Sequence, residues 1–316
     1  MSRKLQRDSL RSELASLEGL LQRIPTSSAA MRKAYELRRQ KLVAQLAAQD
    51  KELDTTANAT IFLGGRRVIG SEAIDAGFAA ETLQAFQSLV LAQALQREGI
   101  PLGARGPLVA RDDLRLNITG TVRGSFGFTL EENAPLGQPL FSSALKDALE
   151  KTTGVIWDFA AVEDERYVAA LDRIDPRMLV GVRTLFKALN DADATIRIVE
   201  GERDAALDSV AVARANERAQ RIEIDEQDIE LDGVLIGVTP VSGGFDFRPD
   251  GSAFPIRGKT GPRLGREFLE RIEQEGVSIG GGRRWRASLR RKIIRRPSGE
   301  PRESYILTDI SPIPQD

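Results

Sequence analysis

Apolar residues at helical spacing open the chain. Four leucines and Ile24 recur every three or four residues through positions 10–24, which is the stripe that one face of a helix requires. The stretch "PTSS" breaks this pattern, and a similar but less regular stripe follows it. The two stripes predict an antiparallel helical hairpin over residues 1–54. The leucines expected along its seam are Leu10, Leu14, Leu17, Leu21, Leu42 and Leu46.

Each helix of this predicted hairpin carries only one thin apolar seam. Isolated helices are marginally stable in water, so we expect further cover for the seams. The hairpin would then either dock on the body of its own chain or mediate assembly with a protein partner, such as a second copy in a homo-oligomer. A solvated helical arm without a partner is the alternative.

The segment 55–134 changes to an α+β pattern. "ATIFLGGRRVIG" predicts two short strands joined by a two-residue turn at Gly64 and Gly65, and a helix follows from about Phe78 to Arg97. Alternating apolar positions then predict two further strands. One should place Leu114, Leu116 and Ile118 on one face, and the other should place Phe126, Phe128 and Leu130 on one face. The expected unit is a small antiparallel sheet covered by a helix.

The rest of the chain divides into a helical segment and a strand-rich segment. Residues 135–220 read as mainly helical, with Asp175 as a helix cap before Pro176 and a strand at "ATIRIVEG". In residues 221–316, three strands, a helix at "PRLGREFLERIEQEG" and two more strands predict a small β-barrel of OB-like or SH3-like type. The predicted fold class is therefore α+β, in four domains.

Charge is unevenly distributed along the chain, although the net charge is only −1. Residues 1–54 carry a net +4, residues 55–134 a net −1, residues 135–232 a net −9 and residues 233–316 a net +5. An acidic centre between two basic ends can serve polyanion binding, self-association or docking within the chain.

The strongest candidate for anion binding is "RRWRASLRRKIIRR", which holds eight basic residues between 283 and 296 and no acid. As a strand it would turn Trp285, Ala287 and Leu289 inward and a row of basic side chains outward. Alternate residues on a strand lie about 7 Å apart, which resembles the spacing of phosphates along an extended nucleic acid. The predicted anion-binding or nucleic-acid-binding residues are Arg284, Arg286, Arg290, Lys292 and Arg296, with Arg257 and Arg263 extending the surface.

Two features argue against this interpretation of the basic strand. "IEIDEQDIELD" places Glu226, Asp228, Glu230 and Asp232 on one side of a strand that a barrel would bring beside the arginines, where ion pairs would neutralise them. Phe245, Phe247 and Phe254 alternate with polar residues and should point into the core, which leaves no aromatic platform for bases. A nucleic acid and an acidic protein therefore both stay open as the anionic partner.

Absent residue types restrict the chemistry. The chain has no cysteine and no histidine, which excludes disulfides, thiolate nucleophiles, zinc sites built on sulfur or imidazole, and histidine-based triads. Carboxylate clusters at Glu131, Glu163 and Asp191 leave a magnesium-dependent phosphodiesterase or nuclease as the alternative function. The "GKTG" at 258–261 lacks the spacing of a phosphate-binding loop. We predict no cofactor and no metal.

The first residues, "MSRKLQRDSL", lack the apolar stretch of a signal peptide, and no apolar run reaches the roughly 20 residues of a membrane span. A cytoplasmic protein without membrane contact is therefore expected.

The stretch "RLNITGTVRGSFGFTLEE", followed by the acidic helical segment and the small basic barrel, resembles uncharacterised proteins of bacterial defence or mobile islands over residues 59–310. The resemblance implies a role in antiviral defence and assigns no residue a function. Together these patterns predict a non-catalytic binding or scaffold protein. It would assemble through its helical arm and contact an anionic partner through the arginine-rich strand.

Overall fold

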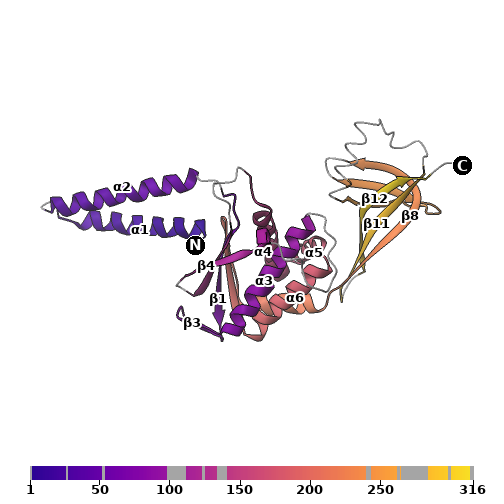
Figure 1. Cartoon of the computed structure of the whole chain (residues 1–316). Coiled ribbons are helices and arrows are strands. Elements are labelled where there is room, and N and C mark those ends of the chain that lie inside the picture. The colour runs from indigo at the N-terminus through magenta and orange to yellow at the C-terminus, as the bar shows by residue number, and fades with distance from the viewer. Residues whose placement is uncertain are drawn as a thin grey trace.

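The computed structural model describes residues 2–25, 28–51, 54–97, 112–122, 125–133, 141–239, 243–261, 264, 284–297 and 300–313. Within these residues the chain forms seven α-helices and three β-sheets, so the predicted α+β class is confirmed. A helical arm, a body of sheet and helices, and a C-terminal sheet follow one another along the molecule (Figure 1).

The arm consists of α1 (Arg3–Arg23) and α2 (Ala29–Lys51), which lie side by side as the leucine spacing predicts. Leu17 and Leu42 are buried between them. The other predicted seam leucines are half-buried, namely Leu10, Leu14, Leu21 and Leu46. The start of α1 contacts the body, where the Ser2 amide donates a hydrogen bond to Thr60 Oγ1 at 3.2 Å. The base of the arm therefore docks on its own chain.

The body contains a five-stranded antiparallel sheet in the order β4-β5-β1-β6-β7. Its strands are β4 (Leu116–Val122), β5 (Phe126–Glu132), β1 (Asn58–Gly65), β6 (Ala194–Glu200) and β7 (Arg203–Leu207). Two short strands, β2 (Val68–Ile69) and β3 (Ala73–Ile74), pair with each other, and a 3-10 turn covers Asp112–Leu114.

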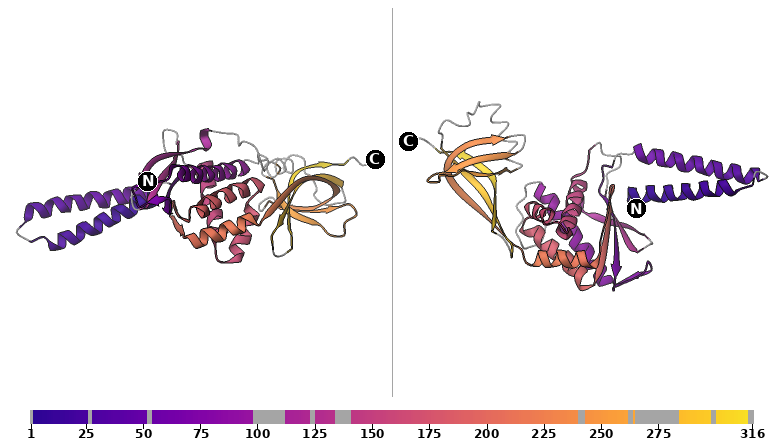
Figure 2. Two further views of the ribbon diagram at one scale, coloured as in Figure 1. Left: turned by 90° about the horizontal axis from the view of Figure 1, so that it is seen from below. Right: turned by 180° about the vertical axis from the view of Figure 1, so that it is seen from behind.

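Helices pack on one face of this sheet (Figure 2). They are α3 (Ala76–Arg97), α4 (Ala144–Ala160), α5 (Asp164–Arg173), α6 (Pro176–Asp191) and α7 (Ser209–Gln220). Their apolar faces and the sheet form one continuous hydrophobic core. Asp175 caps α6 as predicted, because its side chain accepts a hydrogen bond from the Met178 amide at 2.7 Å. The sheet takes strands from both predicted segments 55–134 and 135–220, so these segments share one core.

Two details of the sheet differ from the sequence patterns. The predicted hairpin turn at Gly64 and Gly65 is wrong, because β1 continues through both glycines and pairs with β5 on one side and β6 on the other. At Gly65 the backbone has a φ of 113°, and a side chain there would collide with the backbone of Asp193. Ile118 does not join a buried face, since its side chain is 57% exposed on the edge strand β4.

The C-terminal sheet contains β8 (Glu223–Thr239), β9 (Gly244–Pro249), β10 (Ile256–Thr260), β11 (Arg284–Arg295) and β12 (Arg302–Pro312). Hydrogen-bonded pairs run in the cyclic order β8-β9-β10-β12-β11 and return to β8. All these pairs are antiparallel except β10 with β12. The strands enclose a second hydrophobic core. The predicted helix at 262–276 lies outside the described residues, apart from Leu264.

The aromatic side chains of this sheet follow the prediction only in part. Phe245 and Phe247 are buried in the second core, whereas Phe254 is 81% exposed in the turn before β10. The glycine-lysine-threonine stretch of "GKTG" lies in β10 rather than in a loop. Gly258 faces the Tyr305 carbonyl of β12 so closely that a side chain would not fit.

None of the helices in the described part of the chain combines the length and apolarity that crossing a bilayer requires.

Candidate anion-binding site

The basic strand β11 lies directly beside the acidic strand β8. Their antiparallel register places Arg286 opposite Asp232, Arg290 opposite Asp228 and Lys292 opposite Glu226. Because side chains on adjacent strands point the same way at paired positions, each basic group meets an acid. The structure therefore contains the pairing of acidic β8 with basic β11 that the sequence suggested as the feature against anion binding.

Ion pairs bind the outward arginines to these acids. Arg286 makes two parallel hydrogen bonds to Asp232, of 2.8 Å from Nε to Oδ1 and 3.0 Å from Nη2 to Oδ2. Arg290 Nε donates to Asp228 Oδ1 at 3.0 Å, and Arg284 pairs with Asp250. The hydrogen bond from Arg286 lowers the pKa of Asp232, so this carboxyl is held in its charged form.

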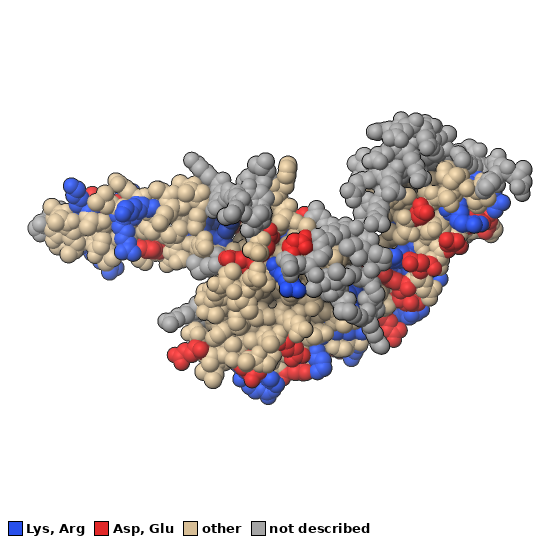
Figure 3. Space-filling model, viewed as in Figure 1, with Lys and Arg blue, Asp and Glu red and all other residues tan. Residues whose placement is uncertain are grey.

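Arg257, predicted to extend the basic surface, donates to Asp246 Oδ1 at 2.9 Å. Basic and acidic side chains mix along the visible edge of the C-terminal sheet instead of forming a basic stripe (Figure 3). The predicted row of cations is therefore a mixed-charge surface with little net attraction for a polyanion. Arg263 lies outside the described residues.

Lys292 differs from the arginines because it is buried, with 7% of its surface exposed. Its Nζ donates hydrogen bonds to the carbonyl oxygens of Leu171, at 3.0 Å, and Ile174, at the end of α5. Burial lowers the pKa of Lys292, while the nearby carboxylates of Glu226 and Asp175 oppose that shift. Lys292 therefore fastens β11 to the body and is not available to a partner, which corrects its prediction as an anion-binding residue.

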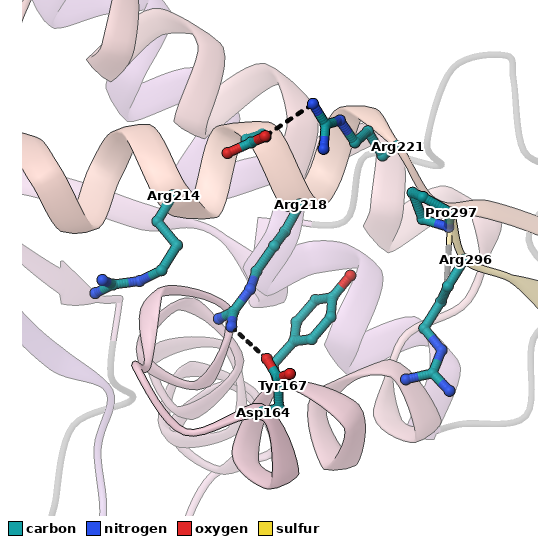
Figure 4. Close-up of a pocket in the computed structure, with 8 residues that line it drawn as sticks. Asp164, Tyr167, Arg214, Arg218, Arg221, Arg296 and Pro297 are labelled. Atoms are coloured by element: carbon teal, nitrogen blue, oxygen red, sulfur yellow. Dashed lines mark hydrogen bonds and ion pairs between the residues drawn. The ribbon is translucent and has the colours of Figure 1, made fainter. Parts of the chain in front are cut away.

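Arg296 reaches a different environment, a pocket of about 270 Å³ where the end of β11 meets the body. The pocket is lined by Asp164, Tyr167, Arg214, Glu217, Arg218, Arg221, Arg296 and Pro297. Figure 4 shows Arg214 and Arg218 on α7, Arg221 just after its last residue, and Tyr167 between Arg218 and Arg296. Four arginines thus line one hollow, and we name it the arginine pocket.

Two of these arginines are held in place by the end of α4. Arg214 donates to the Ala160 carbonyl from Nη2 at 2.7 Å and from Nε at 3.1 Å. Arg218 donates to the carbonyl of Ala161 at 2.6 Å and to Asp164 Oδ1 at 2.7 Å. Its guanidinium also stacks over the Tyr167 ring, with 4.4 Å from Cζ to the ring centroid. These contacts fix the positions of both charges before any ligand arrives.

The remaining two arginines, Arg221 and Arg296, are held by fewer contacts with the protein. Arg221 pairs with Glu217 at 2.8 Å, but both side chains are about 60% exposed, and an exposed pair of this kind contributes little. Arg296 makes no ion pair or hydrogen bond with any residue that the structure describes. Burial raises the pKa of the Tyr167 hydroxyl, and the charges of Arg218 and Arg296 partly offset this shift. The hydroxyl therefore keeps its proton and can donate.

The pocket carries a positive charge that its own residues do not cancel. Four arginines face two acids, Asp164 and Glu217, which leaves a net charge of +2 in the lining. Asp164 is 83% exposed, so water screens its charge more than that of the half-buried Arg218. Such a group of forked donors suits an anion with several oxygen atoms.

Of the pocket residues, the sequence patterns identified only Arg296. Arg214, Arg218 and Arg221 lie in "RANERAQR" at positions i, i+4 and i+7, which is the spacing of one helix face. They were missed because the surrounding segment is strongly acidic overall. Tyr167 gave no local signal, since it comes to the pocket from a helix distant in sequence.

The carboxylates of the alternative magnesium site lie on separate elements. Glu131 accepts a hydrogen bond from Asn58 Nδ2 at 3.1 Å on β5, and Asp191 pairs with Lys187 at the end of α6. No group of three or more potential acidic metal ligands occurs among the described residues. A comparison with protein-family models, curated proteins and solved structures finds no match for the chain.

Proposed function

We propose that this chain is a non-catalytic binding protein that holds an anionic partner in the arginine pocket. The observation that carries the proposal is that four arginines line one hollow, and that one of them, Arg296, lacks a protein partner within the described residues. Two others are fixed by backbone carbonyls, so little conformational entropy is lost when an anion binds.

Under this proposal the C-terminal sheet is a small β-barrel of the OB type. The cyclic pairing supports it, because the first strand, β8, pairs with both the second and the fourth, and the fifth pairs in parallel with the third. OB-type barrels bind ligands with the loops between strands. Arg296 lies on such a loop, between β11 and β12, and that loop contacts the body at the arginine pocket.

The test is a fluorescence-anisotropy titration with labelled anionic probes at two salt concentrations. The probes are single-stranded DNA, RNA, a polyglutamate peptide and a phosphate-bearing ligand. We expect salt-sensitive binding that Arg296→Ser weakens and Arg295→Ser leaves unchanged, because Arg295 is its exposed neighbour outside the pocket lining. Binding by none of the probes at low salt, or equal loss in both variants, would contradict the proposal.

The arm supports a second part of the proposal, assembly with the arm of another copy. Large apolar side chains remain exposed along the hairpin, namely Leu20, Met31, Leu37 and Val43. The arm projects away from the body beyond its docked base, so the described part of the body does not cover them (Figures 1 and 2). Helices with such uncovered residues gain stability by pairing.

Size-exclusion chromatography with light scattering tests this assembly without removing the docked base. Leu37→Glu together with Val43→Glu should reduce the mass to that of one chain. Gln45→Glu, which adds charge at an exposed polar position on another face of the same helix, should not change the mass. An unchanged mass in both variants would remove the assembly role. A role of such an assembly in bacterial defence remains part of the proposal.

A further inference from the structure

We infer that the outer face of helix α2 binds the phosphate backbone of duplex DNA. The outer face is the side of α2 that points away from α1, and its residues recur every three or four positions, as one side of a helix requires. The site lies on the arm, so the inference goes beyond the proposed function and does not depend on the arginine pocket. The residues of the outer face, all exposed, are Ala30, Lys33, Leu37, Lys41, Ala44 and Ala48.

The arm keeps its positive charge beyond its docked base. At the base, Lys4 Nζ lies 3.4 Å from Asp204 Oδ2, and Arg7 pairs with Glu202, so acids of the body neutralise these cations. Residues 9–49 carry seven basic and three acidic side chains, a net charge of +4, and they project away from the body (Figure 1). Basic side chains predominate on the visible side of the arm, whereas both signs mix along the C-terminal sheet (Figure 3). The arm therefore attracts polyanions more strongly than β11 does.

Two lysines of the outer face carry charge that the arm itself does not neutralise. Arg32, Arg38 and Arg39 of α2 each pair with a glutamate of the arm. Lys33 and Lys41 form no ion pair with any residue that the structure describes, and the outer face contains no acid. A partner can therefore reach both ammonium groups without displacing an acid.

The spacing of the two lysines matches the major groove of duplex DNA. Helix residues rise by about 1.5 Å each, so the eight steps from Lys33 to Lys41 span about 12 Å. The major groove of B-form DNA is about 12 Å wide. Four residues turn an α-helix by about 40° beyond one full turn, which places the two lysines on either side of Leu37. A helix that crosses the groove would thus offer one ammonium group to the phosphates of each strand.

This arrangement is compatible with the pairing of two arms. Because the lysines flank Leu37, a contact centred on Leu37 would leave them at its rim, where long charged side chains reach water. A pair of arms would then offer twice as many cations to the same duplex.

Other anionic partners fit the outer face less well. Single-stranded nucleic acids stack their bases on exposed aromatic side chains, whereas Tyr35, the only aromatic residue of positions 1–54, is half-buried. Helices that lie on a membrane bury a broad apolar face, and Leu37 is the single large apolar residue here. Double-stranded RNA has a deep and narrow major groove, and the cores of protein interfaces are depleted in lysine. Charge and spacing together therefore favour duplex DNA.

A fluorescence-anisotropy titration of the full chain tests the inference, with a labelled DNA duplex of about two helical turns, ~20 base pairs. It is run at roughly 50 and 200 mM salt, because each phosphate contact contributes about −0.9 to the slope of log affinity against log salt. The double variant Lys33→Gln, Lys41→Gln removes both charges and keeps the helix propensity. Its affinity should fall by about tenfold or more at ~0.1 M salt, and the slope should become shallower by about 2.

A matched double variant controls for the loss of charge alone. Arg248→Gln with Lys259→Gln removes the same two charges from exposed positions of the C-terminal sheet. This variant should keep the affinity within about twofold, because its cations lie far beyond a Debye length from the arm. Lys33→Arg with Lys41→Arg should retain binding, and circular dichroism would show that all variants are folded.

The outcomes separate this inference from the proposed function. No binding of the duplex at low salt, or equal losses in the two glutamine variants, would overturn the inference. Tighter binding of single-stranded DNA, of double-stranded RNA or of phosphatidylserine vesicles through Lys33 and Lys41 would overturn duplex DNA as the partner. Arg296→Ser should bind the duplex as the wild type does. Loss of duplex binding in Arg296→Ser, with the lysine variant unaffected, would assign the duplex to the arginine pocket, which overturns the inference and supports the proposed function.

Discussion

The two ends of strand β11 contain the same residue types in very different surroundings. At the outer end, Arg284 and Arg286 are half exposed, and they are paired with Asp250 in the turn after β9 and Asp232 on β8. At the inner end, Lys292 is buried against the carbonyls that end α5, and Arg296 faces the arginine pocket without a described partner. Strand β11 and the residue that follows it thus contain paired cations, a buried structural cation and an unpaired cation within thirteen residues.

The difference shows that the number of basic residues in a strand does not measure the charge that a partner meets. That charge depends on which side chains the neighbouring strand or helix places beside each basic residue. Strand β8 supplies an acid opposite each of four basic residues of β11, whereas α7 supplies further arginines to the pocket that Arg296 lines. Charge therefore accumulates where the basic strand leaves its acidic neighbour.

The largest expected effect is the loss of stability when Lys292 is replaced. It would separate the buried inner end of β11 from its exposed outer end. Lys292→Ala removes the donor to two buried carbonyls and a cation that acts on both Glu226 and Asp175. Breaking a buried charged contact of this kind costs about 3 kcal/mol of unfolding free energy. Urea denaturation would measure it. Arg284→Ala, at the exposed end of the same strand, is the control and should change stability much less; equal losses would contradict the comparison.

A smaller effect is expected from Glu226, the acid opposite Lys292. Burial and the nearby Asp175 raise its pKa above the ordinary 4.5, although Lys292 and Arg290 oppose this, and Asp228 adds to it. The folded protein therefore binds this proton more tightly than the unfolded chain does. As the pH rises from 4.5 through the raised pKa, the contribution of Glu226 to the unfolding free energy falls.

Glu226→Gln removes this titration. Relative to the wild type, its unfolding free energy should increase as the pH rises through that window, and the difference should disappear below pH 4.5. Denaturant midpoints between pH 4 and pH 8 would measure it. Glu230, which is exposed and lies opposite Ser288, provides the control. A pH-independent difference for Glu226→Gln would show that packing, and not the charge, is responsible.

Much of the fold follows from local sequence patterns. The leucine stripe predicts the arm, the Asp175-Pro176 pair predicts the start of α6, and alternating residues predict β11 with Trp285 inward. These predictions succeed because neighbouring residues determine helix caps and faces. The position of β1 at the centre of the sheet could not be predicted, because it depends on β5 and β6, both distant in sequence.

The candidate site shows the same limit. Its arginines come from α7 and from the end of β11, and only the packing of the C-terminal sheet on the body brings them together. Within each segment the pattern is visible, as the i, i+4, i+7 arginines of α7 show. The juxtaposition requires tertiary structure, and so does the knowledge that Arg214 is fixed by the carbonyl of Ala160.

The smallest expected effect is the change in anion affinity when the outer arginines are replaced. A large change would contradict the contrast drawn between the two ends of β11. Changing Arg284, Arg286 and Arg290 to Ser removes three cations that are paired with Asp250, Asp232 and Asp228. If those pairs neutralise the surface, the affinity for a phosphate-bearing probe at the arginine pocket should change by less than about twofold at moderate salt, since the Debye length is then about 8–10 Å. The released aspartates should, if anything, repel a polyanion. A loss of about tenfold in anisotropy titrations, with Arg296 intact, would mean that a partner displaces the aspartates and uses the strand itself. In that case the arginines of the ion pairs would exchange their aspartates for the partner. The arginine pocket would then be one end of a longer anion-binding surface along β11.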